Sequence, residues 1–120
     1  MSFKYVKKTT GLTRLNVAKN PQYTLNVLYG KILRTIQKMP ENASYRKYTE
    51  KIVSDRAKIV KESDTVEDIE KKINCGQAEE LIIQAENELI LSRKMLAFKP
   101  WDPIIAKPNA DQWVWPPAGK

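Results

Sequence analysis

The side chains that could perform chemistry in this sequence are few, and the most concentrated group is acidic. Glu79, Glu80, Glu86 and Glu88 crowd one stretch of the chain. Inward-facing carboxylates in a helix bundle can hold a pair of iron ions, but such sites also need histidines from Glu-x-x-His motifs. The chain contains no histidine, and helical projection turns these glutamates outward. We therefore predict no metal site and interpret them as a solvated or partner-facing acidic side.

Cys75 is the only cysteine, so neither an internal disulfide nor a structural zinc site can form. Its place near the end of a predicted helix favours an unreactive thiol that is buried or half-buried. The sequence has no phosphate-binding glycine motif and no Cys-x-x-Cys pair. The lack of histidine also excludes histidine-based triads and proton shuttles. We therefore predict no catalytic residue and no cofactor, and favour a binding or assembly module over an enzyme.

Charge is distributed unevenly along the chain. The net charge is +7, and the first acidic residue is Glu41. A basic N-terminal segment free of acids is a feature of mitochondrial targeting sequences, whereas no apolar run resembles a secretory signal. The single cysteine fits a reducing compartment. No stretch approaches the ~20 apolar residues of a membrane span, so we expect no transmembrane segment.

Helix signals near the N-terminus predict two long helices. Asn20 and Pro21 form a favourable N-cap and first helical residue. We expect this helix to end near Met39, because Pro40 disfavours helical geometry in the residue before it. Asn42 is then predicted to cap the second long helix.

Two further helices are predicted in the second half of the chain. A short helix should begin at Thr65 and end near Cys75, where Gly76 can adopt a left-handed conformation. The last long helix should run from Gln77 to Phe98.

Each of the three long helices carries one apolar stripe at helical spacing. The stripes comprise Leu25, Leu28, Tyr29, Ile32, Leu33 and Ile36 in the first, Tyr45, Tyr48, Ile52, Val53, Ile59 and Val60 in the second, and Ala78, Leu81, Ile82, Ala85, Leu89, Ser92 and Leu96 in the third. These faces can be buried only against one another. We therefore predict an all-α fold, a three-helix bundle in a single domain. A basic arm would cover residues 1–19, the bundle 20–98, and an extended docking tail 99–120.

The tail is too rich in proline to form a helix and too apolar to stay solvated. It holds all three tryptophans, Trp101, Trp113 and Trp115, together with Ile104 and Ile105. One interpretation is that the tail folds back over its own bundle. The other is that it lies across another protein, since tryptophan is enriched at interface hot spots. Both can hold in part, with Trp101 near the bundle and the last two tryptophans and Pro116 reaching outward.

The arm and the last helix supply further candidate partner contacts. Phe3 and Tyr5 lie in the arm, which is either free or docked. Ile83 and Ile90 lie seven residues apart on the outer face of the last helix, where isolated exposure and a partner contact are equally reasonable. Arg56 projects amid the apolar face of the second helix, and we expect an acid such as Glu88 to pair with it.

Lysines and arginines gather opposite the apolar stripes of the first two helices. Solvation is the plain interpretation, and acidic protein, RNA or anionic lipid headgroups are the alternatives. A basic mitochondrial RNA-binding or ribosomal-type helical module is therefore the second candidate function. Steep salt dependence of nucleic-acid binding would favour it.

Several motifs, taken in order, resemble those of a known family. They are Lys7-Lys8-Thr9-Thr10-Gly11-Leu12, Tyr45-Arg46-Lys47-Tyr48-Thr49-Glu50, Gln84-Ala85-Glu86-Asn87-Glu88-Leu89, Arg93-Lys94-Met95, Lys99-Pro100-Trp101-Asp102-Pro103 and Ala110-Asp111-Gln112-Trp113-Val114-Trp115-Pro116. Together they resemble the subunit 5 family of the alpha subcomplex of mitochondrial NADH:ubiquinone oxidoreductase, respiratory complex I. The resemblance covers nearly the whole chain, and the tail motif is its most distinctive part.

This resemblance implies a non-catalytic accessory subunit in respiratory electron transport. Such a subunit would support the assembly and stability of the matrix-side hydrophilic arm, in contact with its core and accessory subunits. It would be peripheral to the mitochondrial inner membrane, on the matrix side. The resemblance carries over no catalytic residue, so the tail and helix contacts above remain inferences from residue type.

Overall fold

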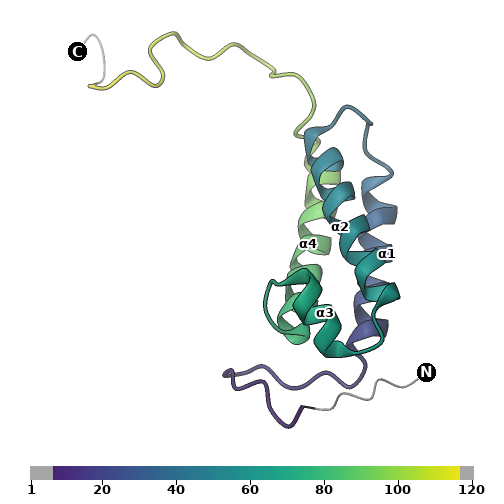
Figure 1. Ribbon diagram of the computed structural model, residues 1–120. Coiled ribbons are helices and arrows are strands. Elements are labelled where there is room, and N and C mark those ends of the chain that lie inside the picture. Colours follow the sequence, from purple (N-terminus) through teal and green to yellow (C-terminus); the bar gives the residue numbers. More distant parts are fainter. Residues whose placement is uncertain (1–6, 117–120) are drawn as a thin grey trace.

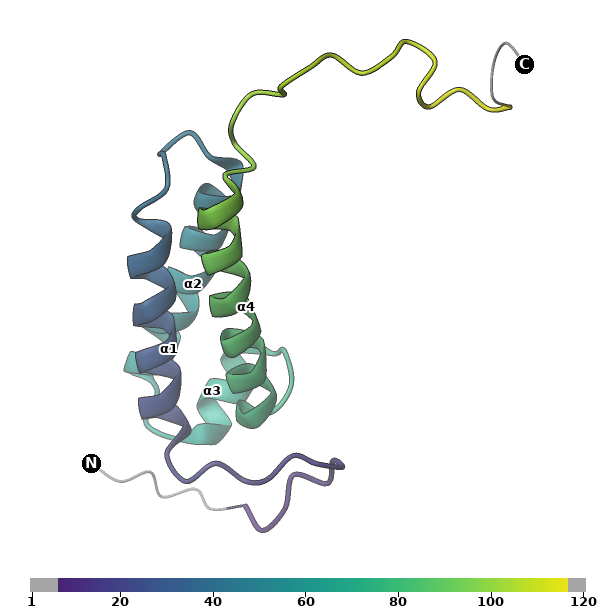
Figure 2. The same cartoon turned by 180° about the vertical axis from the view of Figure 1, so that it is seen from behind.

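The computed structural model describes residues 7–116, and within this range the chain forms four helices and no strand (Figure 1). They are α1 (Pro21–Ile36), α2 (Ser44–Glu62), α3 (Val66–Ile73) and α4 (Ala78–Phe98). The prediction of an all-helical fold is confirmed. The long helix α1 packs against both α2 and α4, whereas α2 and α4 do not pack closely against each other. Figures 1 and 2 show this arrangement from opposite sides, with α3 at the end where the arm lies.

Helix α1 begins as its sequence predicts but ends earlier. The Asn20 side chain accepts a hydrogen bond from the Tyr23 N–H at 3.3 Å, and Pro21 is the first helical residue. Beyond Ile36 the backbone tightens, with the Lys38 N–H bonding to Thr35 at 3.2 Å and the Met39 N–H bonding to Ile36 at 3.0 Å. These tighter turns end the helix before Pro40 takes effect.

Helix α2 has no side-chain cap, so the prediction for Asn42 is wrong. The helix starts at Ser44, and its N-cap residue is Ala43, which is buried. Burial of Ala43 in the turn between α1 and α2 fixes where the chain enters the helix, and this places the cap position one residue beyond Asn42.

The short helix α3 starts with a clear cap and ends before the predicted glycine. The Thr65 side chain accepts a hydrogen bond from the Asp68 N–H at 3.1 Å. Asn74 adopts the left-handed conformation with φ of 55° and ends the helix at Ile73, so the predicted end near Cys75 is two residues late. Asparagine tolerates this conformation better than most residues. Gly76, with φ of 102°, then turns the chain into α4.

Buried aliphatic side chains from all four helices form the core. The largest that are fully buried are Leu25, Ile32, Ile36, Val60, Ile69 and Leu81. Each contributes about 1.5–3 kcal/mol relative to an exposed position. The predicted stripes of α1 and α4 therefore face the core. The predicted stripe of α2 is only partly buried, because Tyr48 is 71% exposed and Ile52 is 53% exposed. Both lie on a side of α2 that α4 does not cover.

The segments before α1 and after α4 leave opposite ends of the bundle. The arm runs across the end near α3, and the tail departs from the C-terminal end of α4 and extends away from the helices (Figures 1 and 2). None of the helices in residues 7–116 is long and apolar enough to cross a membrane.

Candidate partner-binding surfaces

The tail has two parts, which are its root at Trp101, packed on the bundle, and its exposed remainder, residues 102–116. Trp101 is half-buried against the core and borders a hollow of about 370 Å³ with Tyr45 and Met95. Beyond it, Trp113 is 90% exposed and Trp115 is 86% exposed. Ile104 is 80% exposed, and Pro116 is exposed as well. Trp101 thus packs near its own bundle, whereas the last two tryptophans contact none of the helices in the core.

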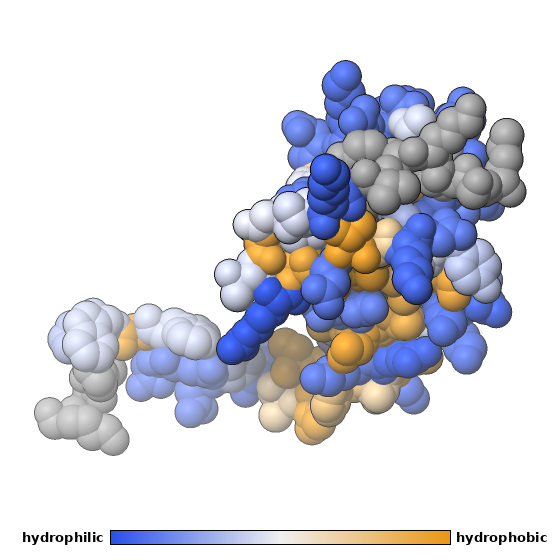
Figure 3. All heavy atoms as spheres, turned by 90° about the horizontal axis from the view of Figure 1, so that it is seen from below, coloured by the Kyte–Doolittle hydropathy of each residue, from blue (hydrophilic) through white to orange (hydrophobic). Residues whose placement is uncertain are grey.

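Exposed indoles at the end of an extended segment are unfavourable in water. Each tryptophan buries on the order of 200 Å² when it docks. In the view from below, the tail stands apart from the helical body, whose hydrophilic surface is broken by apolar side chains (Figure 3). Large exposed apolar groups of this kind mark protein–protein contacts. The exposed remainder of the tail is therefore a candidate partner-binding surface.

The other predicted contacts are less concentrated. On α4, Ile83 is 43% exposed and Ile90 is 53% exposed, and neither residue borders the hollow beside Trp101. Phe3 and Tyr5 lie outside the described residues. The structure therefore does not join these four side chains to the tail in one continuous surface.

Polar contacts dock the described part of the arm on the bundle. The Lys7 ammonium group donates hydrogen bonds of 2.9 Å to each of Glu70, Gln77 and Glu79. The arm is also held through Thr10, whose carbonyl accepts from the Gln77 side chain at 2.7 Å. Lys7 therefore connects the arm to both α3 and α4.

Two kinds of effect act on the pKa of Lys7 in opposite directions. Burial lowers it, whereas the hydrogen bonds and negative charges of Glu79 and Glu70 raise it and together prevail. The pKa of Lys7 is therefore raised, and the ammonium form is favoured in the folded chain.

Glu79 does not face outward, and its predicted place on a solvated or partner-facing acidic side is wrong. It is 3% exposed, and it accepts hydrogen bonds from the Lys7 ammonium group and, at 3.4 Å, from the Ala18 N–H. It also lies in the first turn of α4, where a negative charge is favourable. Helical projection missed this pair because the arm that covers Glu79 lies far away in sequence.

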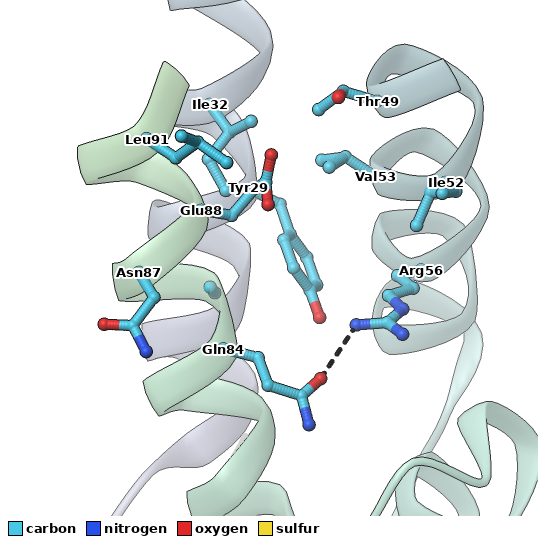
Figure 4. A pocket seen from close by; sticks show the side chains of 11 residues that line it. Tyr29, Ile32, Thr49, Ile52, Val53, Arg56, Gln84, Asn87, Glu88 and Leu91 are labelled. Carbon is cyan, nitrogen blue, oxygen red and sulfur yellow. Dashed lines mark hydrogen bonds between the residues drawn. The ribbon is translucent and has the colours of Figure 1, made fainter. Parts of the chain in front are cut away.

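A groove of about 450 Å³ separates α2 from α4 above a floor formed by α1 (Figure 4). Aliphatic and polar side chains contribute to its lining in about equal number. Its lining residues are Tyr29, Ile32, Thr49, Ile52, Val53, Arg56, Gln84, Ala85, Asn87, Glu88 and Leu91. Sequence analysis missed this groove because an apolar stripe predicts burial but does not say which helix provides it.

The polar groups around the groove differ from the predicted Arg56–Glu88 pair. Arg56 donates to the Gln84 side chain at 3.2 Å and to the Cys75 sulfur at 3.4 Å. Glu88 instead accepts a hydrogen bond from the Tyr45 hydroxyl. The predicted pairing is therefore wrong, and two separate polar contacts connect α2 with α4.

Two tyrosines near the groove have raised pKa values. Burial raises the pKa of Tyr45, and its hydrogen bond to the charged Glu88 raises it further. Burial also raises the pKa of Tyr29, and the positive charge of Arg56 partly opposes this effect. The Tyr29 hydroxyl oxygen is buried next to the Arg56 guanidinium but forms no hydrogen bond of ordinary geometry.

Cys75 is exposed, so the expectation of a buried or half-buried thiol is wrong. Helix α3 ends before it, and the residue lies in the turn that leads to α4. Across residues 7–116, no group of three or more His, Cys, Asp or Glu residues is placed to hold a metal ion. The exposed tryptophans of the tail and the groove between α2 and α4 are instead features of a small helical binding or assembly module.

Comparison with known proteins identifies the family within this class. Residues 14–80 match the family model described as "ETC complex I subunit conserved region". NADH dehydrogenase (ubiquinone) 1 alpha subcomplex subunit 5 of Bos taurus is 49% identical over 111 residues, which cover 92% of this chain and 96% of the relative. The probable subunit 5 of Caenorhabditis elegans is 44% identical over 110 residues, covering 92% of this chain and 73% of the relative. The probable mitochondrial subunit 5 of Arabidopsis thaliana is 45% identical over 96 residues, which cover 80% of this chain and 57% of the relative.

The chain belongs to this family of complex I subunits. It is a non-catalytic accessory subunit of mitochondrial complex I and takes part in respiratory electron transport as one component of a hetero-oligomer.

Proposed function

We propose that the chain supports the assembly and stability of the matrix-side hydrophilic arm of complex I, and that its tail clasps neighbouring subunits of that arm. It would be peripheral to the mitochondrial inner membrane, on the matrix side. The bundle would act as a folded body, and the exposed tail would provide the main anchor. Basic faces on the helices would orient the subunit against acidic surfaces of its neighbours.

The exposure of Trp113 and Trp115 is the observation that carries this proposal. Both side chains are at least 86% exposed, although they belong to the most apolar part of the tail. A tail that served only to enlarge its own core would place these indoles against the helices. Burial against a neighbouring subunit removes their apolar surface from water instead.

Replacement of both tryptophans tests the proposal. The chain with Trp113→Ala and Trp115→Ala, produced in cells that lack the native subunit, should be lost from complex I on native gels. Its helical circular dichroism should be unchanged, because the two side chains are not part of the core. The matched control is Tyr23→Ala on α1, which removes an aromatic side chain that is 66% exposed but far from the tail in sequence. Normal incorporation of the double variant would contradict the docking role of the tail.

The RNA-binding alternative has weaker support. Lys47, Lys51, Lys58 and Lys61 are all exposed on α2, as a nucleic-acid surface would require. Exposed lysines are equally expected of a solvated helix face, and the chain belongs to a family of respiratory-chain subunits. Binding of a structured RNA that weakens steeply with salt would favour the alternative.

A further inference from the structure

We propose that the groove between α2 and α4 seats a helix from a partner subunit, and that this helix carries an apolar stripe and one carboxylate that binds Arg56 and Tyr29. The site lies on the bundle and is built without the tail. It therefore makes a second, separate contact in addition to the proposed clasp.

The walls of the groove show an unfilled position in the helical packing. Its deeper surface consists of side chains such as Ile32, Val53 and Ala85, each at most 3% exposed. At its rims, Ile52 is 53% exposed and Leu91 is 43% exposed, one on each wall. Because α1 packs against both walls while α2 and α4 meet through side-chain contacts such as Arg56–Gln84, a partner helix laid along the groove would cover both rims.

The dimensions of the groove suit a short helical segment. Its lining runs from Thr49 to Arg56 on α2 and from Gln84 to Leu91 on α4, about two helical turns or roughly 10 Å on each wall. An amphipathic helix fills such a groove with apolar anchors at positions i, i+3 or i+4, and i+7. One face of a partner helix is therefore enough to cover the exposed rims.

Two charged residues line the groove, and only Arg56 calls for a charged partner, because Glu88 already accepts a hydrogen bond from Tyr45. Tyr29 is 2% exposed, and its hydroxyl lies beside the Arg56 guanidinium without forming a hydrogen bond of ordinary geometry. Arg56 forms no ion pair with any carboxylate of the described residues, and its two side-chain partners, Gln84 and Cys75, leave its charge unneutralised. Figure 4 shows the Tyr29 ring directed toward Arg56 between the two walls.

A carboxylate satisfies both groups at once. It accepts hydrogen bonds and donates none, so it can accept from the Tyr29 hydroxyl and the Arg56 guanidinium together. A hydrogen bond between two charged groups is also stronger than one between neutral groups. An aspartate or glutamate on the apolar-faced helix would therefore give Arg56 the charged partner that Glu88, bonded to Tyr45, does not provide.

Fluorescence anisotropy with the full chain tests this inference. The probe is a labelled amphipathic peptide of about 16 residues, with leucines at the anchor positions and one glutamate beside them. A matched peptide has glutamine in place of glutamate. We expect the glutamate peptide to bind about tenfold more tightly, and we expect this difference to disappear with Arg56→Gln.

Three variants separate a binding role from a structural one. Ile52→Asp should abolish binding, whereas the control Ile83→Asp, on an exposed α4 isoleucine outside the groove, should leave it unchanged. Tyr29→Phe removes a buried hydroxyl that forms no hydrogen bond of ordinary geometry, so the free chain should stay folded. It should nevertheless weaken the glutamate peptide a few-fold more than the glutamine peptide.

Each remaining outcome would overturn the inference. Equal binding of the two peptides, or no binding of either, would exclude a carboxylate-bearing helix as the occupant. A chain truncated after Pro103 that binds the peptide at least tenfold more tightly would show that the chain's own tail fills the groove. Dimers of the isolated chain that dissociate with Ile52→Asp would assign the groove to a second copy. Failure of tail docking in the native-gel experiment would leave these results unaffected.

Discussion

The described parts of the arm and the tail flank the same bundle and form no helix there, yet their side chains lie in opposite environments. Lys7 in the arm has a side chain that is only 9% exposed and is bound to two glutamates. Trp113 and Trp115 in the tail remain almost fully exposed. The more polar segment is thus tied to its own bundle, while the more apolar one extends away from it.

Complementarity explains this contrast better than hydrophobicity alone. The end of the bundle near α3 offers Glu70 and Glu79 close together, which match one ammonium group. The opposite end offers a hollow that borders Trp101 but does not include the later tryptophans. The bundle therefore has a site for the arm and for the root of the tail, and the other indoles need a surface that this chain does not provide.

The largest effect should follow from breaking the contact of the arm. Lys7→Met leaves Glu79 buried without its ammonium partner, and breaking a buried ion pair on one side costs about 3–5 kcal/mol. We therefore expect the free energy of unfolding, measured with urea, to fall by about 3 kcal/mol. Lys8→Met is the control, because Lys8 is exposed and should change stability by less than about 0.5 kcal/mol. Equal effects of the two substitutions would show that the arm contributes little.

A smaller effect is expected at the root of the tail. Trp101→Ala removes a half-buried indole that packs against the core. Because complete removal of a buried aromatic costs about 3–5 kcal/mol, the loss here should be about 1–2 kcal/mol. The same urea measurement checks it. A loss near zero would place Trp101 with the exposed part of the tail.

Alkaline pH should weaken the bundle through three groups at once. The pKa values of Lys7, Tyr29 and Tyr45 are all raised above their ordinary values of 10.5 and 10.0. A raised pKa means that the folded state holds its proton more tightly than the unfolded state does. The stability that these groups contribute is therefore complete below about pH 10 and is lost as the pH rises through the folded-state values.

Urea midpoints measured across this alkaline range test that expectation. The midpoint should fall more steeply in the native chain than in the Tyr45→Phe variant, because phenylalanine has no proton to lose. Identical slopes would mean that the hydrogen bond between Tyr45 and Glu88 does not favour the neutral tyrosine.

The smallest effect should come from the exposed tryptophans. Trp113→Ala with Trp115→Ala should change the unfolding free energy of the isolated chain by less than about 0.5 kcal/mol, since neither side chain belongs to the core. A thermal melt of the isolated chain checks this. A clear loss of stability would mean that these indoles pack against the bundle in solution.

Local sequence signals predicted the helices better than the surfaces. Asn20 and Thr65 cap their helices as expected, because an N-cap depends on a few neighbouring residues. Asn42 does not cap α2, because the buried Ala43 takes that position.

Contacts between distant segments could not be read from the sequence. Glu79 projects outward on its helix, but the arm covers it and supplies Lys7. Ile52 belongs to the apolar stripe of α2 and is still exposed, because α4 does not pack against that side. In both cases burial depends on which neighbouring segment is present, and a helical projection does not contain that information.

Peptide-resolved hydrogen–deuterium exchange of residues 104–116 tests the central claim most directly. It compares the isolated chain with the same chain in purified complex I, without any substitution. We expect rapid exchange in the isolated chain and strong protection in the complex, because the tail would be covered by a neighbouring subunit. Equally rapid exchange in both states would contradict the account, as would strong protection in the isolated chain.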